Sequence, residues 1–278
     1  MPEMPEVQAH AERLTDDFAG DALSRFRPIT FTALKTFSPA PEEAVGHPLI
    51  DVGRRGKYLL LRFEPVTFVV HLMQGGRLKP DEKQASKPRG GQARWTFADG
   101  RALLLTEAGT ERKAGVWVVA GDPDGQDPLD HLGPEAAAVD RATLARLLSE
   151  HRMRLHGWLR DQHILAGLGR RLANEVCHRA KISPFANTGK LDDEAVDRLH
   201  EAIAACIAES LAYERSRPDM SSSKDRPGAV HHREGEACPV CGDTVRAVEY
   251  SRYTVNYCPT CQTGGKVLAD NTTSKFLK

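Results

Sequence analysis

The sequence predicts an α+β protein with more than one domain, because three kinds of pattern follow one another along its 278 residues. Short apolar runs separated by Gly, Pro and Asp fill 26–120, amphipathic patterns fill 140–215, and two C-x2-C pairs follow. Strands without intervening helices are typical of an antiparallel sandwich. We therefore predict an N-terminal antiparallel β-sandwich domain over 1–130, a helical domain over 131–220, and a zinc-finger hairpin with a tail over 221–278.

The composition is that of a globular protein, with 40% hydrophobic and 27% charged residues. No apolar run approaches the roughly 20 residues of a membrane span. The acidic first helix also lacks the basic start and apolar centre of a signal peptide. We therefore expect a cytoplasmic protein without a membrane partner, in which paired cysteines hold metal rather than form disulfides.

The formal net charge of zero conceals a segregation of charge along the chain. Residues 54–79 hold six Lys/Arg and one acid, and residues 152–190 hold eight Lys/Arg and two acids. Residues 121–150 hold seven acids and two arginines. Basic segments balanced by a remote acidic segment can build a positive face. Ordinary solvated surface is the alternative that the charge count leaves open.

The chain begins Met1-Pro2-Glu3, and this start predicts amine chemistry. An initiator Met is normally removed before a small residue, which would leave Pro2 as a secondary amine. An α-amino group has a pKa near 8, so part of it is neutral and nucleophilic at cellular pH. Such an amine can add to a sugar aldehyde carbon to give an iminium, while Glu3 moves protons. A tolerated translation start is the alternative on these residues alone.

The N-terminal domain is predicted to open with an amphipathic helix over 5–19. Its apolar face consists of Val7, Ala11, Leu14 and Phe18, which are spaced by four, three and four residues. This helix would hold the N-terminal amine against the body of the protein. The predicted strands, each bounded by turn residues, are 29–37, 57–63, 66–73, 94–98, 102–106 and 116–120.

The acidic, Pro- and Gly-rich segment 121–135 is predicted to be the linker that closes the first domain. The predicted helices of the next domain are 142–150, 153–162, 169–181 and 192–212. Two glycines in the connection before the third helix permit positive φ. The helix start that follows offers a phosphate site, and an ordinary helical hairpin turn is the alternative. Segment 216–237 has almost no apolar content and is predicted to be a flexible linker with exposed histidines, His231 and His232.

Two cysteine pairs, Cys238/Cys241 and Cys258/Cys261, frame sixteen residues. This spacing predicts one structural Zn²⁺ ion held by four thiolates at the base of a hairpin with strands over 244–248 and 254–257. Metal binding would supply much of the folding free energy of so small a piece. Two disulfides or redox pairs are the alternatives. The other cysteines, Cys177 and Cys206, are predicted to be buried structural thiols.

Over nearly its whole length the chain resembles the formamidopyrimidine-DNA glycosylase/endonuclease VIII (Fpg/Nei) group of DNA repair glycosylases. The stretches that carry the resemblance, in chain order, are Pro2-Glu3, Glu6, Gly56-Lys57-Tyr58-Leu59, His71-Leu72, Gly76-Arg77-Leu78, Leu132-Gly133-Pro134-Glu135, Leu159-Arg160-Asp161-Gln162, Ala166-Gly167-Leu168-Gly169, Ala173-Asn174-Glu175, Ser183-Pro184 and Cys258-Pro259-x-Cys261-Gln262. The helical stretches among them look like a helix–two-turn–helix motif.

The resemblance implies a monomeric, nucleoid-associated enzyme that binds double-stranded DNA with oxidised bases or abasic sites between two lobes. It would flip the damaged nucleotide out of the stack. Pro2 would attack C1′ and displace the base, Glu3 would act as acid and base, and Lys57 would bind a phosphate. Successive β- and δ-elimination would then cut the strand. Glu6 would brace the first helix.

The resemblance also implies DNA contacts and shows departures from the family pattern. The implied contacts are Lys57, His71, Met73, Arg112, Gly169, Arg170, Asn174 and Arg252. Arg170 stands where the family usually has Asn, and an arginine can still pair with phosphate. Residues 105–113 hold no Arg-x-Phe, so we expect the opposite base to be recognised differently. Two further departures concern Met73 and Arg252. The family usually has His-Leu-Gly-Met, whereas here Met73 directly follows His71-Leu72. The finger arginine usually lies five residues before the third cysteine, whereas Arg252 lies one position earlier.

Two other functions are compatible with the sequence. The first is a damage- or abasic-site-binding DNA protein of the same family with weak catalysis. The second is an unrelated zinc protein that binds RNA or other proteins.

Overall fold

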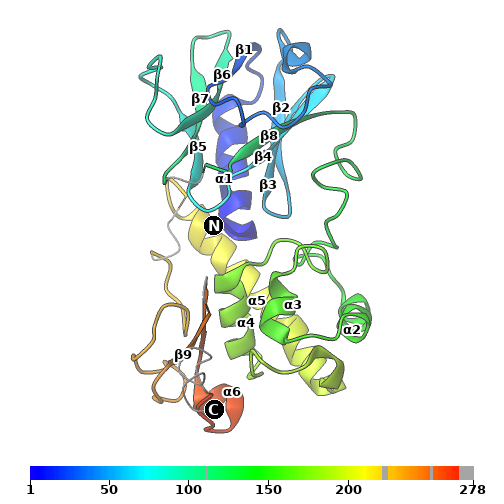
Figure 1. The fold of residues 1–278 in the computed structure, drawn as a ribbon, viewed down its shortest axis with the longest axis vertical. Helices are drawn as coiled ribbons and strands as arrows, with labels where there is room; N and C mark the ends of the chain where they lie inside the picture. Colours follow the sequence, from blue (N-terminus) through cyan, green and yellow to red (C-terminus); the bar gives the residue numbers. More distant parts are fainter. Residues whose placement is uncertain (110–111, 221–224, 251–252, 269–278) are drawn as a thin grey trace. The chain divides into compact units, whose positions relative to one another are not determined.

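The computed structural model describes residues 1–109, 112–220, 225–250 and 253–268 and divides into two compact units. Unit 1 holds Met1–His131 with Pro218–Met220, and unit 2 holds the remainder. Antiparallel sheets follow an N-terminal helix in unit 1, and helices followed by a cysteine hairpin make up unit 2 (Figure 1). The predicted fold class is confirmed.

Unit 1 opens with helix α1 (Met4–Phe18). The Glu6 carboxylate accepts a hydrogen bond from the Glu3 backbone N–H at 3.0 Å, which forms one half of a capping box. The predicted apolar face, which includes Val7 and Leu14, is buried. The prediction of a helix over 5–19 is therefore correct to within one residue at each end.

Within the described part of unit 1, two four-stranded antiparallel sheets have the orders β1-β6-β7-β5 and β2-β3-β4-β8. The strand bounds are β1 Leu23–Pro28, β2 Leu49–Arg55, β3 Tyr58–Phe63, β4 Val66–His71, β5 Gly76–Pro80, β6 Gly91–Phe97, β7 Ala102–Glu107 and β8 Gly115–Ala120, with a short 3₁₀ helix η1 at Pro41–Ala44. Five of the six predicted strands correspond to β3, β4, β6, β7 and β8.

The predicted strand over 29–37 is wrong. That segment is turns and irregular chain, and its two aromatic side chains, Phe31 and Phe37, are 93% and 96% exposed. The true strand β1 lies just before it, and β2 and β5 were not predicted. Register shifts between Leu23 and Arg25 in β1, and between Leu49 and Asp51 in β2, break the two-residue alternation on which strand prediction depends.

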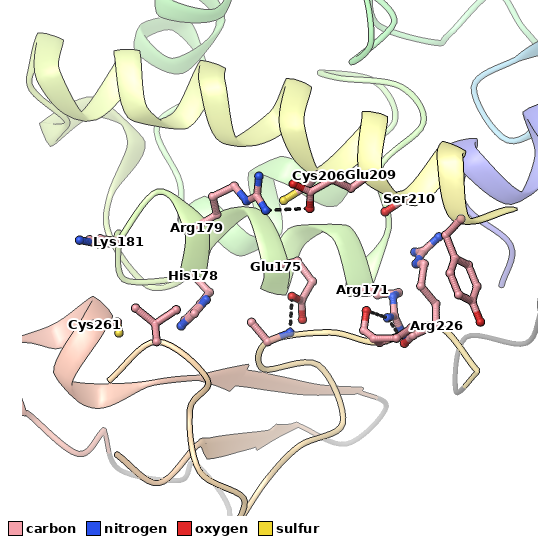
Figure 2. A pocket seen from close by; sticks show the side chains of 14 residues that line it. Arg171, Glu175, His178, Arg179, Lys181, Cys206, Glu209, Ser210, Arg226 and Cys261 are labelled. Carbon is pink, nitrogen blue, oxygen red and sulfur yellow. Dashed lines mark hydrogen bonds and ion pairs between the residues drawn. The ribbon is translucent and has the colours of Figure 1, made fainter. Parts of the chain in front are cut away.

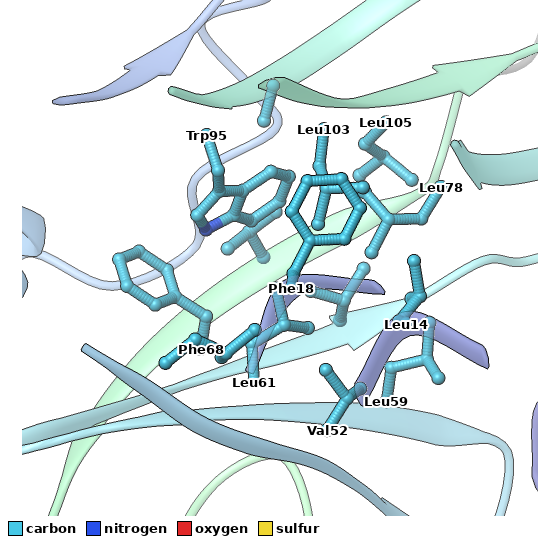
Figure 3. Packing of buried hydrophobic residues seen from close by; sticks show 14 of the residues in the cluster. Leu14, Phe18, Val52, Leu59, Leu61, Phe68, Leu78, Trp95, Leu103 and Leu105 are labelled. Carbon is cyan, nitrogen blue, oxygen red and sulfur yellow. The ribbon is translucent and has the colours of Figure 1, made fainter. Parts of the chain in front are cut away.

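The core of unit 1 lies between the two sheets and includes the buried face of α1 (Figure 3). Phe18 of α1 packs against Phe97, with ring centroids 5.0 Å apart. Phe68 of one sheet meets Trp95 of the other edge to face, at 5.8 Å. Such aromatic pairs add to the free energy of area burial, so α1 and the chain start are fixed firmly to the sandwich.

Unit 2 contains α2 (Arg141–Glu150), α3 (Leu155–Arg160), α4 (Arg170–Arg179), η2 (Thr188–Lys190) and α5 (Asp193–Arg215), then β9 (Arg246–Tyr250), β10 (Tyr253–Tyr257) and α6 (Pro259–Thr263). Side-chain caps start two helices, because Asp140 accepts from the Thr143 N–H at 2.7 Å and Asp192 from the Ala195 N–H at 2.8 Å. The predicted helices and the hairpin are present, with ends shifted by a few residues. No helix in the described ranges is both long and apolar enough to span a bilayer.

Candidate active site and metal centre

The start of α1 holds the predicted catalytic residues of unit 1. Pro2 and Glu3 are buried, whereas Met1 is 44% exposed. The capping bond between Glu3 and Glu6 fixes the backbone directly after Pro2. The chain therefore enters the protein at Pro2 and leaves the preceding residue at the surface.

Lys57 and His71 lie beside this chain start. Lys57 is buried next to β3, and His71, the last residue of β4, pairs with Tyr58 across the sheet with ring centroids 4.5 Å apart. Burial, with the positive charges of Lys57 and of the chain's N-terminal amino group, lowers the pKa of His71 to about 4. His71 is therefore neutral at cellular pH, and two cationic groups act on one buried imidazole.

The tautomer of His71 follows from its contact with Met73. The Met73 backbone N–H donates to His71 Nδ1 at 3.1 Å, which leaves the ring proton on Nε2. Met73 itself has φ +51°, a left-handed conformation that is uncommon for a non-glycine residue. The loop after β4 thus presents a half-buried methionine in a fixed, unusual backbone conformation.

The other predicted contact in unit 1, Arg112, is exposed on the chain between β7 and β8. Residues 110–111 lie outside the described residues. The Ala114 N–H donates to Glu107 Oε2 at 2.6 Å and so joins the two ends of this loop. The structure places Lys57, His71 and the start of the chain close enough for the positive charges of Lys57 and of the N-terminal amino group to act on the His71 imidazole.

In unit 2 the two-turn connection is organised by Gln162, which the sequence analysis named within the stretch 159–162 but gave no role of its own. Its Oε1 accepts from the Gly167 N–H at 3.0 Å, and its Nε2 donates to the Arg160 and Leu168 carbonyls at 2.8 and 2.9 Å. Gly167 has φ +106°, whereas Gly169 is extended and is the N-cap of α4. Only the first of the two glycines therefore uses positive φ. The sequence signal that could have indicated the role of Gln162 is a glutamine placed five residues before this glycine, in the same connection.

Asn174 faces the interior of unit 2, although the resemblance implied a DNA contact. Its side chain is 0% exposed. Its amide Nδ2 lies 2.9 Å from His231 Nδ1 and 3.5 Å from Asn256 Oδ1. The amide thus links α4 to β10 and to the preceding loop. The prediction of two exposed loop histidines is wrong for His231, which is buried, and correct for His232.

The segment before the hairpin is not a simple flexible linker. The Glu175 carboxylate accepts from the backbone N–H groups of Ala229, Val230 and His231 at 2.7, 3.1 and 2.8 Å. The Arg171 guanidinium donates to the Pro227 carbonyl at 2.8 Å and also to the Arg226 carbonyl. Both side chains project from α4 toward this segment (Figure 2). The flexible-linker prediction is therefore wrong for 225–231, because polar backbone there is bound to α4.

Aromatic and guanidinium groups stack where the hairpin meets α3. The rings of Tyr250 and Tyr253 are 4.7 Å apart at 12°, and Arg160 Cζ lies 4.3 Å from the Tyr253 ring centroid. Arg154 donates to the Tyr250 hydroxyl at 3.2 Å. The predicted contact Arg252 lies outside the described residues.

The four hairpin cysteines form a compact group. The Sγ–Sγ distance is 4.0 Å between Cys238 and Cys261 and 3.3 Å between Cys241 and Cys258. Zn–S bonds of about 2.3 Å in a tetrahedron give sulfur separations of about 3.8 Å, so the group fits one tetrahedral ion. The residues are therefore compatible with a structural metal site, and zinc remains our prediction for the ion.

His178 of α4 also belongs to this group, since its ring nitrogen and the Sγ atoms of Cys238, Cys258 and Cys261 all lie within 4.8 Å of one another. The sequence reasoning did not connect this histidine with the cysteines. The remaining thiols, Cys177 and Cys206, are buried as predicted, and burial raises the pKa of both.

Comparison with known proteins identifies the family. The model of the formamidopyrimidine-DNA glycosylase N-terminal domain matches residues 1–116, and that of the H2TH domain of the same enzymes matches residues 130–222. The formamidopyrimidine-DNA glycosylase of Symbiobacterium thermophilum is 32% identical over 94% of this chain and 89% of its own length. The chain belongs to the formamidopyrimidine-DNA glycosylase (Fpg/Nei) family. Members of this family are DNA glycosylases of DNA repair, and the predicted resemblance is thereby confirmed.

Other relatives extend this picture of an Fpg/Nei protein. The Chloroflexus aurantiacus formamidopyrimidine-DNA glycosylase is 30% identical over 94% of this chain and 98% of its own length. An uncharacterised formamidopyrimidine-DNA glycosylase-like protein of Mycobacterium tuberculosis is 44% identical over 53% of this chain and 94% of its own length.

Solved structures share the Fpg/Nei fold. A point mutant of Lactococcus lactis Fpg in complex with Fapy-dG-containing DNA superposes with a TM-score of 0.84, at 22% identity over 94% of this chain and 100% of that chain. A complex of Lactococcus lactis Fpg with abasic-site DNA gives a TM-score of 0.84 at 21% identity, over 94% of this chain and 99% of that chain.

Proposed function

We propose that this protein is a bifunctional DNA glycosylase and abasic-site lyase that removes oxidised bases from double-stranded DNA, with Pro2 as the nucleophile. The supporting observation is that a buried Pro2-Glu3 pair lies in the same neighbourhood as Lys57 and a neutral His71. An amine nucleophile needs a nearby carboxylate for proton transfer and a cationic group to hold the substrate phosphate. All three are contributed by unit 1.

The reaction begins with removal of the exposed Met1, which converts the Pro2 nitrogen from an amide into a secondary amine. The uncharged amine adds to the sugar C1′ as the bond from C1′ to the damaged base breaks, and the proton that the Pro2 nitrogen loses balances the one that the departing base takes up. Glu3 gives a proton to the ring oxygen, so the bond from C1′ to that oxygen breaks, the sugar opens and an iminium forms between Pro2 and C1′. Loss of a C2′ proton then expels the 3′ phosphate, and a second elimination expels the 5′ phosphate. Hydrolysis of the remaining iminium returns the free secondary amine of Pro2.

Lys57 holds the phosphate beside the reacting sugar, where its buried position keeps the ammonium from being screened by solvent. The imidazole of His71 adds a hydrogen-bond donor, Nε2–H, without adding charge. We propose Met73, Arg112, Gly169, Arg170 and Arg252 as further DNA contacts. Asn174, whose buried side chain links α4 to β10, stays in the proposed set.

The relatives support the proposed substrate class. The curated relatives carry the name formamidopyrimidine-DNA glycosylase, and the solved neighbours hold DNA with Fapy-dG or an abasic site. We extend this to oxidised bases and abasic sites for this chain, which acts as a cytoplasmic, nucleoid-associated monomer with one structural Zn²⁺ ion. Because 105–113 lack an Arg-x-Phe sequence, the base opposite the lesion is recognised by other residues.

The test is borohydride trapping of the iminium on duplexes carrying 8-oxoguanine, a formamidopyrimidine, thymine glycol, dihydrouracil or an abasic site. We expect a covalent protein–DNA adduct with the unmodified protein. The adduct should be lost when the Pro2 amine is blocked by acetylation, and should persist with Pro5→Ala, a matched proline change in the same helix. An adduct that forms in full yield with the acetylated protein would exclude Pro2 as the nucleophile.

One sequence feature favours a second candidate, a damage-binding protein of the same family with weak catalysis. Residues 105–113 lack the Arg-x-Phe that, by the resemblance, probes the base opposite the lesion. This candidate predicts tight, salt-sensitive binding to abasic DNA and no trapped adduct on any duplex of the panel.

A further inference from the structure

His178 contacts the cysteine group from outside the hairpin. Its Nε2 lies 3.3 Å from Cys238 Sγ, and the side chain is 5% exposed. It projects from α4 toward the segment that carries the cysteines (Figure 2). Neither the cysteine spacing nor the family comparison assigns a role to this histidine.

The cysteines by themselves satisfy a tetrahedral ion. Their two C-x2-C pairs supply four thiolates. The Sγ–Sγ distances of 4.0 Å between Cys238 and Cys261 and of 3.3 Å between Cys241 and Cys258 lie on either side of the ideal tetrahedral edge of about 3.8 Å. A fifth ligand would exceed the coordination number of a structural zinc site. The imidazole nitrogen is, however, within hydrogen-bonding distance of a thiolate sulfur.

We propose that His178 donates an Nε2–H···Sγ hydrogen bond to the Cys238 thiolate and so fixes the metal centre to α4. A donor to a coordinated thiolate disperses part of its negative charge and orients it toward the ion. His178 is thus a positioning residue rather than a ligand. This inference concerns the metal centre alone and does not depend on the proposed reaction at Pro2.

A second link on the same side of the centre involves Gln262, which follows the last cysteine. Its Oε1 accepts from the Cys258 N–H at 2.8 Å, and its Nε2 donates to the Ile182 carbonyl at 3.0 Å. Ile182 lies three residues beyond the end of α4. One cysteine of each pair is therefore connected to α4 or to the chain that follows it. We expect a change in these contacts on the α4 side to alter how tightly the cysteines hold the metal.

The experiment measures metal transfer from the purified full-length protein to a chromogenic chelator. His178→Phe keeps the ring volume but removes the donor, whereas His178→Gln keeps an N–H near the same place. We expect release to be about 10- to 100-fold faster with His178→Phe and near the unmodified rate with His178→Gln. The matched control is His200→Phe, which removes a half-buried ring that contacts the Val139 carbonyl at 3.0 Å and should not change release.

Two outcomes would overturn this role. Release from His178→Phe at the unmodified rate would show that the contact does not hold the metal. Retention of a full metal equivalent by Cys241→Ser, with loss of metal from His178→Gln, would make His178 the fourth ligand. If His178→Phe does not fold, ¹¹³Cd NMR of the unmodified protein decides instead: we expect a four-thiolate shift, and a shift typical of three thiolates and one nitrogen would contradict the proposal.

Discussion

Glu175 accepts a hydrogen bond from the backbone N–H of His231 at 2.8 Å, although the two residues are 56 positions apart. The same carboxylate also receives the N–H groups of Ala229 and Val230. One α4 side chain therefore satisfies three successive backbone donors in a segment with little apolar content. This is how a polar sequence becomes ordered without a hydrophobic core of its own.

Replacement of Glu175 by Gln should destabilise unit 2. The neutral amide offers one acceptor oxygen and places an NH₂ group against backbone donors, so we expect a loss of about 2–3 kcal/mol. Urea unfolding followed by circular dichroism measures it. The control is Glu209→Gln, which breaks an exposed ion pair with Arg179 and should cost less than about 1 kcal/mol. Equal losses from both variants would contradict the role of Glu175.

Replacement of Gln162 by Ala should loosen the two-turn connection. The change removes the acceptor of Gly167 N–H and the donor to two carbonyls, and we expect it to cost about 1–3 kcal/mol. Affinity for abasic duplex should fall with it. Gln126→Ala, which removes two exposed hydrogen bonds in unit 1, should leave both stability and affinity nearly unchanged. Hydrogen exchange at Gly167 provides the local measurement.

Lys57→Ala should reduce the salt dependence of DNA binding. If the Lys57 ammonium neutralises one phosphate, the slope of log K against log salt falls in magnitude by about 1. Fluorescence anisotropy with abasic duplex at several salt concentrations measures the slope. Lys35→Ala removes an exposed lysine that contacts the Thr32 carbonyl and is the matched control. An unchanged slope in Lys57→Ala would exclude the phosphate contact.

Unit 1 should lose stability as the pH falls below about 6.5. Burial lowers the pKa of His10 to about 4, with the charges of Arg13, Lys79 and Asp219 also acting on it, and its Nε2 contacts the Leu78 carbonyl at 2.6 Å. Between these pH values the unfolded chain binds a proton that the folded chain does not, so stability decreases toward pH 4. One such group contributes at most about 3 kcal/mol.

The comparison of melting temperatures at pH 7.5 and 5.0 tests this pH dependence. His10→Gln should show a smaller decrease than the unmodified protein, because the titrating group is gone. The decrease should not vanish, since His71 has a similarly low pKa in the same unit. His47→Gln, at an exposed position, should leave the decrease unchanged. A pH effect that is the same in His10→Gln would assign the loss to other groups.

The sequence predicted secondary structure best where apolar residues recur with one regular spacing along a whole element. The apolar face of α1 keeps a 3.6-residue spacing from Val7 to Phe18 and could be predicted almost to its ends. β1 and β2 could not be predicted because a bulge shifts their register. The exposed Phe31 and Phe37 instead made an irregular segment resemble a strand.

The candidate site also had a part that the sequence could indicate and a part that it could not. Residues close together in sequence, such as Pro2 and Glu3 or the paired cysteines, could be proposed as candidates from the sequence alone. Contacts between distant residues could not, because no local pattern brings His178 to Cys238 or Asn174 to His231. A buried polar side chain on a helix indicates that a partner exists but does not say which segment supplies it.

The return of residues 218–220 to unit 1 has a consequence for biosynthesis. Met220 is buried in the hydrophobic cluster of the sandwich. During translation the ribosome must therefore produce nearly all of the helical region before this cluster can close. A truncated polypeptide ending at His131 should therefore expose the apolar side chains that Met220 covers, and we expect it to aggregate. Co-expression of the missing C-terminal portion should reduce this aggregation.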